Sequence, residues 1–341
     1  MTLIDPALAH DPSRHSGVAL TGTTASLGIL MGHVFRRSSG RAWRLRRRSM
    51  ELWPLWSELL STAEEPLILH TPLVQLAASE QEADLQQRLA EARRDLGLAF
   101  RSARSLASDH PDWPAARHGG LLSQRDGRVD PLLLQQALRR ELAKCDVALR
   151  ATQACRLGRH QQRWRLDLKD GSSLETDQVV ICTGLASQQL LAPLGHARPL
   201  EPVLGQVLQL RLNDPAALNS QWPAVLVSHG VNLVRQGRDQ LWLGATLEPG
   251  SAPDHGATLV MRRLEGDAPE WLRQASVVDQ WYGLRARPSG RPAPLLDVLE
   301  PGLILASGHY RNGVLLAPAT AEWVTDQIPR PGIGSTMLTK P

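Results

Sequence analysis

Two kinds of strand pattern occur in this chain, and together they limit the folds that it can adopt. The run Val179-Val-Ile-Cys-Thr-Gly184 is largely apolar on consecutive positions and ends in glycine, which is typical of a strand buried on both faces in a parallel sheet. The run Leu208-Gln-Leu-Arg-Leu212 alternates apolar and polar residues, and much of 232–245 does the same, as in a half-buried antiparallel sheet. The two patterns predict an α/β part with an inserted, antiparallel β-rich part.

Helical patterns separate these strands. Apolar residues recur at helical spacing over 41–60 and over 81–96, and Gly97 after the second segment is a typical helix stop. Asp130 and Pro131 predict the start of a third helix, because aspartate caps free amides and proline fits the first turn. Further patterns predict helices over 259–275 and 314–328 and strands over 163–168 and 303–306.

The composition is that of a globular protein, with 42% hydrophobic and 21% charged residues, which excludes disorder, collagen-like repeats and coiled coil as the main architecture. No apolar run approaches the ~18 residues of a membrane helix, and no basic-then-apolar leader opens the chain. We therefore expect a cytoplasmic protein with no membrane partner. The cysteines, Cys145, Cys155 and Cys182, have no paired spacing, so we expect no disulfide and no metal site and interpret them as buried apolar residues.

The cations are nearly all arginine, since Lys144, Lys169 and Lys340 are the only lysines. Arginine has a planar fork suited to carboxylates and phosphates, although a GC-rich genome would produce the same bias. The arginine-rich run 36–48 would also attract nucleic acid. Proteins that bind nucleic acid usually stack bases on Phe and Tyr, and this chain has two of each. We interpret the run as the solvent-exposed face of a helix and expect no nucleic-acid partner.

Three segments far apart in the sequence suit a dinucleotide cofactor. Asp5 follows a short apolar strand, and an acid at the end of the second strand of a dinucleotide fold accepts hydrogen bonds from the ribose. The buried strand 179–184 leads into a small-residue turn, which permits close approach of the backbone to a cofactor. The glycine-flanked loop 308–313 opens a helix whose free amides would stabilise negative charge. Each signal alone also fits an ordinary strand or turn.

Two arginines occur close to these glycine-rich segments. Arg285 ends the run Gly283-Leu-Arg285, and Arg311 lies inside the loop 308–313. A guanidinium fork binds a carboxylate through two parallel hydrogen bonds. The two residues are therefore candidates for binding a substrate carboxylate.

The segment 308–319 resembles the C-terminal signature of the D-amino-acid-oxidase family of FAD-dependent oxidoreductases, in the form found in the glycine oxidases of thiamine biosynthesis. Looser similarity extends to 126–131, 179–184 and 243–250, and the segment 23–28 is similar to the part of the family that lies against the flavin. The resemblance covers almost the whole chain. It implies an FAD-dependent amino-acid oxidase.

The resemblance also implies roles for individual residues. Arg285 and Arg311 would bind the substrate carboxylate, and Asn232 stands where glycine oxidases have a tyrosine in the substrate pocket. The family needs no catalytic acid or base from the protein, so none is assigned, and His309 is interpreted as a structural hydrogen-bond donor. The residues that would contact FAD are Asp5, Thr23, Thr24, Ala25, Ser26, Gly28, Ala154, Gly184, Gly308, His309, Tyr310, Arg311, Asn312, Gly313, Val314 and Leu315.

The fold that we expect is α/β, a Rossmann-like FAD-binding domain with an inserted antiparallel β-rich substrate domain. A dinucleotide fold also needs a first strand and a G-x-G-x-x-G turn, and no such motif occurs in the sequence. We therefore expect an FAD domain truncated at its N-terminus by about 30 residues, the scale of part of a βαβ unit, through a late start codon or a truncated gene. The predicted segments are 1–60, 120–195 and 295–330 for the FAD domain, 61–119 and 196–294 for the substrate domain, and 331–341 for a tail.

The function expected from the resemblance is oxidation of glycine or a similar small amino acid or amine to the imine, with molecular oxygen as co-substrate and peroxide as product, in thiazole formation for thiamine. One alternative is a flavin amino-acid or amine dehydrogenase that passes electrons to another acceptor. Others are an inactive truncated relative and a non-catalytic scaffold or nucleic-acid-binding protein that uses the run 36–48. The sequence is compatible with a homo-oligomer.

Overall fold

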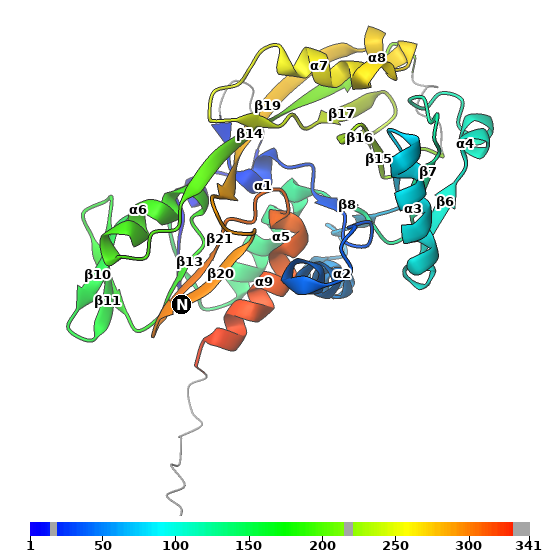
Figure 1. Cartoon of the computed structure of the whole chain (residues 1–341). Helices are drawn as coiled ribbons and strands as arrows, with labels where there is room; N and C mark the ends of the chain where they lie inside the picture. The colour runs from blue at the N-terminus through cyan, green and yellow to red at the C-terminus, as the bar shows by residue number, and fades with distance from the viewer. Residues whose placement is uncertain (14–18, 215–220, 330–341) are drawn as a thin grey trace, which may run out of the picture.

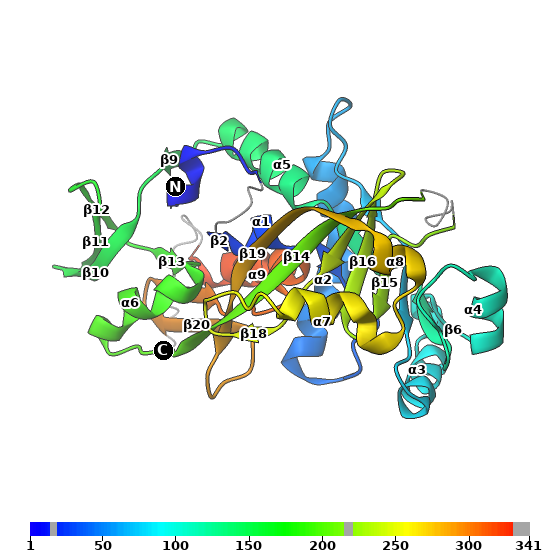
Figure 2. The ribbon, with the colours of Figure 1, turned by 90° about the horizontal axis from the view of Figure 1, so that it is seen from above.

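The computed structural model of the protein describes residues 1–13, 19–214 and 221–329, so the predicted tail 331–341 lies outside the described residues. A broad sheet forms one half of the molecule and carries α7 and α8 on its outer side (Figure 1). The other half holds α2, α5 and α9 beside smaller sheets (Figures 1 and 2). The strands β14 and β19 run from one half into the other.

The broad sheet is mostly antiparallel, as the alternating sequence pattern predicts. Two parallel pairings, of β2 with β19 and of β5 with β15, join segments from the N-terminal third to it. Its strands are, in spatial order, β2 (Ala19–Leu20), β19 (Ser276–Pro288), β14 (Leu200–Arg211), β17 (Gln240–Gly244), β16 (Val231–Gln236), β15 (Val225–Ser228), β5 (Leu73–Leu76), β7 (Gly120–Ser123) and β6 (Leu98–Arg101), with β18 (Glu248–Pro249) beside β14.

The longest ladder joins β14 and β19. These strands pair antiparallel along the whole length of β14, with a single irregularity near its end. The register places Gly205 opposite Gly283 and Val203 opposite Arg285. The side chain of Arg285 is thereby directed at the backbone of β14.

The smaller sheets include the parallel strands that the apolar run predicts. In the described residues, β13 pairs only with β21 and β1 pairs only with β9, both in parallel. Each of these strands therefore has one open edge, and the truncation of the FAD domain stays a prediction. The strands of the smaller sheets are β1 (Thr2–Ile4) and β9 (Ala148–Arg150); β13 (Val179–Ile181), β21 (Leu303–Ser307) and β20 (Leu295–Glu300); β10 (Ala154–His160), β11 (Arg163–Leu168) and β12 (Ser173–Thr176); and β3 (Ile29–Leu30), β8 (Gly127–Val129) and β4 (Leu69–His70).

The helices of the second half pack on one another through an apolar cluster that includes Trp53 and Leu315. The Trp53 side chain is fully buried, and its indole Nε1 donates to the carbonyl of Leu315 over 3.0 Å, which joins α2 to α9. The helices of the described chain are α1 (Gly22–Ala25), α2 (Gly40–Leu60), α3 (Glu80–Ala92), α4 (Ala103–Asp109), α5 (Pro131–Lys144), α6 (Ser187–Leu191), α7 (Ala257–Arg263), α8 (Glu270–Gln274) and α9 (Gly313–Gln327).

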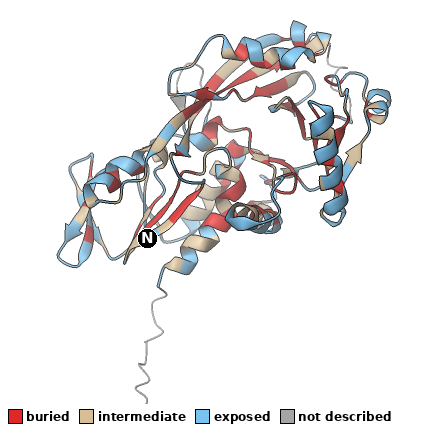
Figure 3. Cartoon of the chain, in the orientation of Figure 1, coloured by how far each residue is buried: buried red, intermediate tan, exposed pale blue. Residues whose placement is uncertain are grey.

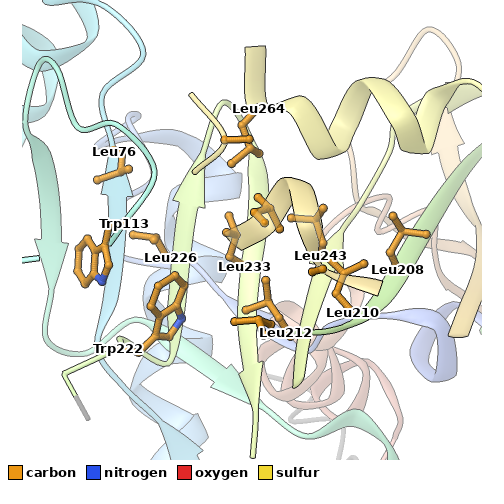
Figure 4. Close-up of a cluster of buried hydrophobic side chains, with 14 of the residues drawn as sticks. Leu76, Trp113, Leu208, Leu210, Leu212, Trp222, Leu226, Leu233, Leu243 and Leu264 are labelled. Atoms are coloured by element: carbon orange, nitrogen blue, oxygen red, sulfur yellow. The ribbon is translucent and has the colours of Figure 1, made fainter. Parts of the chain in front are cut away.

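A second apolar cluster fills the space between the broad sheet and the helices α7 and α8 (Figure 4). Leucines from successive strands, including Leu210, Leu233 and Leu243, point to one side of the sheet, where Leu264 and Leu272 cover them. Figure 3 shows the buried residues concentrated on these strands and the exposed ones on the outer sides of the helices. The core therefore sits on both sides of the ladder between β14 and β19.

Several predicted elements are confirmed, and two helices differ from prediction. The helices expected at 41–60 and from Pro131 are α2 and α5. The helix expected over 81–96 ends at Ala92, because Arg93 leaves the helical conformation and turns its guanidinium to another segment. The segment 259–275 forms two short helices, since the backbone turns between them through residues with positive φ.

The interpretation of the cysteines as buried residues is wrong. Cys145 caps the end of α5, Cys155 lies on an exposed side of β10, and Cys182 follows β13; all three are exposed free thiols. The sequence pattern did not predict this exposure, because a small residue such as cysteine is accommodated at buried and at exposed positions alike. The domain limits given above stay a prediction.

We expect Trp53→Ala to lower the free energy of unfolding by about 3–5 kcal/mol, since it removes a large buried side chain and leaves a cavity between α2 and α9. Urea denaturation followed by circular dichroism measures this change. Leu59→Ala on the same helix is the control: Leu59 is 73% exposed, so its loss should cost less than about 0.5 kcal/mol. Equal effects of both substitutions would contradict the packing described here.

Candidate active site

A cavity of about 2000 Å³ lies between the two halves of the molecule. Its walls come from β1, the segment around α1, the end of β13, the loop after β21, and the strands β14, β16 and β19. Pockets that bind small ligands usually hold about 300–1,000 Å³. This cavity therefore has room for a cofactor and a substrate together.

Nearly all the predicted site residues line this one cavity, although they come from seven separate segments. Thr24 is the exception, because it lies on the side of α1 that faces α5 and not the cavity. Its hydroxyl contacts Thr21 Oγ1 at 2.8 Å and the Gln135 side chain. The predicted residues that line the cavity are Asp5, Thr23, Ala25, Ser26, Gly28, Ala154, Gly184, Asn232, Arg285, Gly308, His309, Tyr310, Arg311, Asn312, Gly313, Val314 and Leu315.

The Arg285 guanidinium is held against the backbone of β14. Its Nη1 donates to the carbonyls of Leu204, at 2.9 Å, and Thr246, at 3.2 Å. A Cβ atom on Gly205 would lie 2.1 Å from Arg285 Nη2, so only glycine leaves room for this arrangement. The Nη2 group makes no hydrogen bond to a described residue, so its N–H groups are available to a ligand.

The electrostatic surroundings of Arg285 favour an anion. Burial lowers the pKa of Arg285, and the positive charge of Arg311 lowers it further, whereas Tyr310 and Glu248 act in the opposite direction. Two guanidinium groups near each other in a poorly hydrated site repel, and a bound carboxylate relieves that repulsion. The pair can therefore bind the carboxylate of a small ligand.

Asn232 on β16 lines the same cavity. Its Nδ2 donates to the carbonyl of Gly244 at 2.9 Å. Its Oδ1 is buried and accepts no hydrogen bond from the described residues. An acceptor left without a donor costs free energy, so a ligand N–H group would be favoured there.

The loop after β21 forms a backbone cradle at the start of α9. Gly308 has φ +63°, and a Cβ atom there would lie 2.9 Å from Pro288 Cγ, so the loop needs glycine. Asn312 precedes α9 but makes no side-chain hydrogen bond to the first-turn amides. These free amides at the start of a fifteen-residue helix stabilise negative charge in the cavity.

His309 is part of this loop and carries no charge near neutral pH. Burial lowers its pKa to about 4, and the positive charge of Arg41 contributes. Its Nε2 lies 2.9 Å from Thr320 Oγ1 on α9. The ring therefore links the loop to the helix as a neutral hydrogen-bond partner.

Two buried charged residues that sequence reasoning missed hold the segment 32–37, part of which lines the cavity. The Asp126 carboxylate is fully buried and accepts hydrogen bonds from the amides of Gly32, His33 and Val34 at 2.9–3.0 Å. The Arg93 guanidinium donates to three carbonyls of the same segment. Asp126 lies inside the motif 126–131, but no sequence pattern shows that its partners are amides some ninety residues away.

Arg46 corrects the interpretation of the arginine-rich run as a solvent-exposed face. Its neighbours Arg44, Arg47 and Arg48 on α2 are exposed, but Arg46 is only 8% exposed and lines the cavity. In a run of arginines on a helix, only some positions of each turn face the protein interior. The spacing of the apolar residues in this helix does not show which arginine occupies such a position. Besides the arginines outside this helix, the cavity is therefore lined by a buried arginine of α2.

These features fit the parts of FAD unequally. The glycine cradle and the free amides of α9 suit a flavin ring, and Asp5, which ends β1, suits the ribose, as the sequence predicts. Because the sequence has no G-x-G-x-x-G turn, no residue is assigned to the pyrophosphate. In the described part of the chain, no three His, Cys, Asp or Glu side chains gather as metal ligands, and no helix has the length and apolar character to cross a membrane.

The chain was compared with known families and proteins. The model of the DAO family, FAD dependent oxidoreductase, matches residues 13–327. The glycine oxidase of Pseudomonas putida is 28% identical over 304 residues, which cover 85% of this chain and 80% of that protein. The bifunctional protein ThiO/ThiG of Synechocystis sp. is 34% identical over 222 residues, 62% of this chain, and the match spans only 32% of that longer protein.

Solved structures show the same fold. The crystal structure of glycine oxidase from Geobacillus kaustophilus superposes with a TM-score of 0.80 at 24% identity, covering 96% of this chain and 87% of that one. Iminodiacetate oxidase from Chelativorans sp. BNC1 gives a TM-score of 0.79 at 20% identity, covering 97% and 90%. The predicted α/β fold, with an FAD-binding domain and a β-rich substrate domain, is confirmed.

We expect Gly205→Ala to weaken binding of a small carboxylate such as acetate about tenfold, or about 1.4 kcal/mol, because the new methyl group displaces the Arg285 guanidinium. The dissociation constant is measured by titration of the visible spectrum of the FAD-loaded protein. Gly158→Ala is the matched control, since nothing lies within 4 Å of a Cβ atom there. Unchanged acetate binding in Gly205→Ala would show that Arg285 does not depend on this glycine.

We expect Asp126→Asn to lower the free energy of unfolding by about 1–3 kcal/mol, because an amide group cannot accept from all the donors that now surround the carboxylate. Hydrogen exchange at the amides of residues 32–34 should accelerate in the folded protein. The exposed Asp112 has no side-chain partner among the described residues, so Asp112→Asn is the control. Unchanged protection at 32–34 would refute the anchoring role of Asp126.

Proposed function

The chain belongs to the DAO family of FAD-dependent oxidoreductases, and we propose that it oxidises glycine or a similar small amino acid or amine to the imine, with molecular oxygen as acceptor and peroxide as product. The observation that carries this proposal is the pair Arg285 and Arg311, two cations on the wall of a cavity that also holds the glycine cradle. A carboxylate next to the reacting carbon would bind there. Proteins named glycine oxidase among the relatives support this substrate.

The cofactor would be held mainly by backbone. The loop from Gly308 to Gly313 would lie along the flavin, with the free amides of α9 directed at its negative charge, and the segment from Thr23 to Gly28 would pack beside it. When bound, FAD supplies the two-electron acceptor for a hydride from the substrate carbon. The Gly28 backbone has φ +69° and no space for a Cβ atom, which keeps this segment close-packed on β8.

The protein's part in the reaction is to orient the substrate and keep its amine neutral. The Arg285 fork fixes the carboxylate and hence the position of the α-carbon. Neighbouring positive charges and apolar lining such as Val207 disfavour an ammonium ion, so the amine loses its proton more easily than in water. The nitrogen lone pair of the neutral amine then forms the C=N bond as the hydride leaves. Asn232 Oδ1 would accept a hydrogen bond from the substrate N–H group.

The biological role is part of the same proposal. Several relatives are bifunctional ThiO/ThiG proteins, which supports a role in thiazole formation for thiamine, in the cytoplasm. A dehydrogenase that uses another acceptor would give imine without peroxide. The open edges of β1 and β13 favour a second candidate, a relative that retains FAD weakly. The visible spectrum of the purified protein, followed by peroxide release with a panel of amines, distinguishes these cases.

We expect Arg285→Ala to raise the KM for glycine by the equivalent of about 2–5 kcal/mol, because truncation leaves the substrate carboxylate without its buried partner. Arg285→Lys should restore only part of the affinity, since an ammonium lacks the planar fork. Peroxide release under steady-state conditions gives kcat and KM, and FAD absorbance confirms that the variants keep the cofactor. An unaltered KM in Arg285→Ala would remove this residue from the carboxylate site.

A further inference from the structure

Three arginines of the described chain are buried, and they differ in what compensates their charge. Arg93 donates to three backbone carbonyls, and Arg128 pairs with Asp130 at 3.4 Å. Arg46 has neither arrangement. Its one hydrogen bond to a described residue is from Nη1 to the carbonyl of Ala42, in its own helix, at 3.4 Å.

The guanidinium of Arg46 is therefore largely unsatisfied. Its Nε is buried without a partner, and no described carboxylate lies within ion-pair distance. It stacks on the Phe35 ring, 3.8 Å from the ring centroid, which fixes the plane of the fork but uses none of its five N–H donors. Burial lowers the pKa of Arg46, and no neighbouring acid counteracts this effect. A buried charge without a partner is costly, so an anion would be favoured at this position.

The charges that line the cavity are unevenly distributed. The acidic residues are Asp5, next to β1, and Glu175, on β12. Both elements lie on the opposite side of α9 from α2, which carries Arg46 (Figures 1 and 2). The arginines that line the cavity are Arg36, Arg37, Arg46, Arg285 and Arg311.

A substrate with one carboxylate, bound by Arg285 and Arg311, would leave the Arg46 guanidinium without an anion. Arg285 and Arg311 suffice for one carboxylate, and Arg36 already pairs with Glu82 at 3.0 Å. Arg46 then remains without an anion. Because Asp126 and Arg93 hold the backbone around Phe35, the platform under the Arg46 fork is also fixed.

We propose that the substrate is an aminodicarboxylate, whose second carboxylate binds the Arg46 fork while the first binds Arg285 and Arg311. The inference rests on the proposed oxidase function and narrows its substrate class from small amines to amines with a distal acid group. Only one hydrogen bond to a described residue, from Nη1 to Ala42, uses the donors of the stacked Arg46 guanidinium, and a guanidinium can bind a carboxylate through two parallel N–H groups.

The test compares matched amines that differ only at the distal end. The pairs are N-(carboxymethyl)glycine against N-ethylglycine, N-(2-carboxyethyl)glycine against N-propylglycine, and D-glutamate against D-norvaline. We expect kcat/KM to be at least about tenfold higher for the acid member of one pair, the value of one charge-assisted contact of about 1.4 kcal/mol. Equal kcat/KM values within every pair would overturn the proposal.

Variants of Arg46 assign the preference to this side chain. Arg46→Met should reduce kcat/KM far more for the dicarboxylate than for its partner, so that their ratio approaches one. Arg46→Lys should give an intermediate ratio, because the charge stays and the fork is lost. Arg44→Met, at an exposed position on the same helix, should leave the ratio unchanged. A wild-type ratio in Arg46→Met would overturn the proposal, and if that variant does not fold, a wild-type ratio in Arg46→Lys would overturn it.

A binding measurement separates this inference from the proposed function. Glutarate and adipate should raise the Tm of the FAD-loaded wild-type protein more than butyrate and pentanoate do, and Arg46→Lys should reduce that difference. If the wild-type protein oxidises no amine but the difference is present, the oxidase function fails and the dicarboxylate site stands. If amines are oxidised but the dicarboxylates give no larger shift and no higher kcat/KM, the oxidase stands and the Arg46 site fails.

Discussion

The antiparallel ladder between β14 and β19 determines where Arg285 lies in the cavity and where α1 packs. Its register brings Gly205 opposite Gly283, and the two missing side chains leave adjacent spaces on the same face of the sheet. The Arg285 guanidinium occupies the space over Gly205, and Ala25 of α1 occupies the space over Gly283. One pairing therefore positions both the arginine proposed to bind a carboxylate and the segment proposed to contact the flavin.

The cavity combines positive charge with poor hydration, and these two properties act together on a bound amino acid. Guanidinium groups that are removed from water bind a carboxylate more strongly than exposed ones do. The same charges disfavour an ammonium ion, which is the form that must lose its proton before oxidation. Free amides at the start of α9 extend the positive potential toward the proposed flavin position. In the proposed reaction, binding and activation of the substrate would thus have a common electrostatic origin.

Local signals in the sequence predicted the elements that depend on neighbouring residues. Asp130 caps α5 through hydrogen bonds to two amides, and Pro131 begins that helix, as their sequence positions indicate. All but one of the site residues that the resemblance implied line one cavity. Thr24 does not line it, because only the packing of α1 decides which threonine faces the cavity. The roles of Arg93, Asp126 and Arg46 were not predictable. Arg93 and Asp126 depend on contacts with a distant segment of the chain, and Arg46 depends on which side of α2 faces the cavity. The local spacing of residues in the sequence shows neither of these things.

The way Asp126 and Arg93 hold the segment 32–37 has a consequence for how the protein can evolve. Apart from the bond to the His33 ring, their hydrogen bonds to this segment go to backbone amides and carbonyls. Every residue type except proline has both of these groups. The side chains of Met31, Val34 and Phe35, which line the cavity, make none of these hydrogen bonds. Substitutions at Met31 and Phe35, which are only partly buried, can therefore reshape the cavity while the path of the backbone is conserved, whereas Val34 also belongs to an apolar core cluster. Selectivity can thus diverge among descendants at these two positions without loss of the fold.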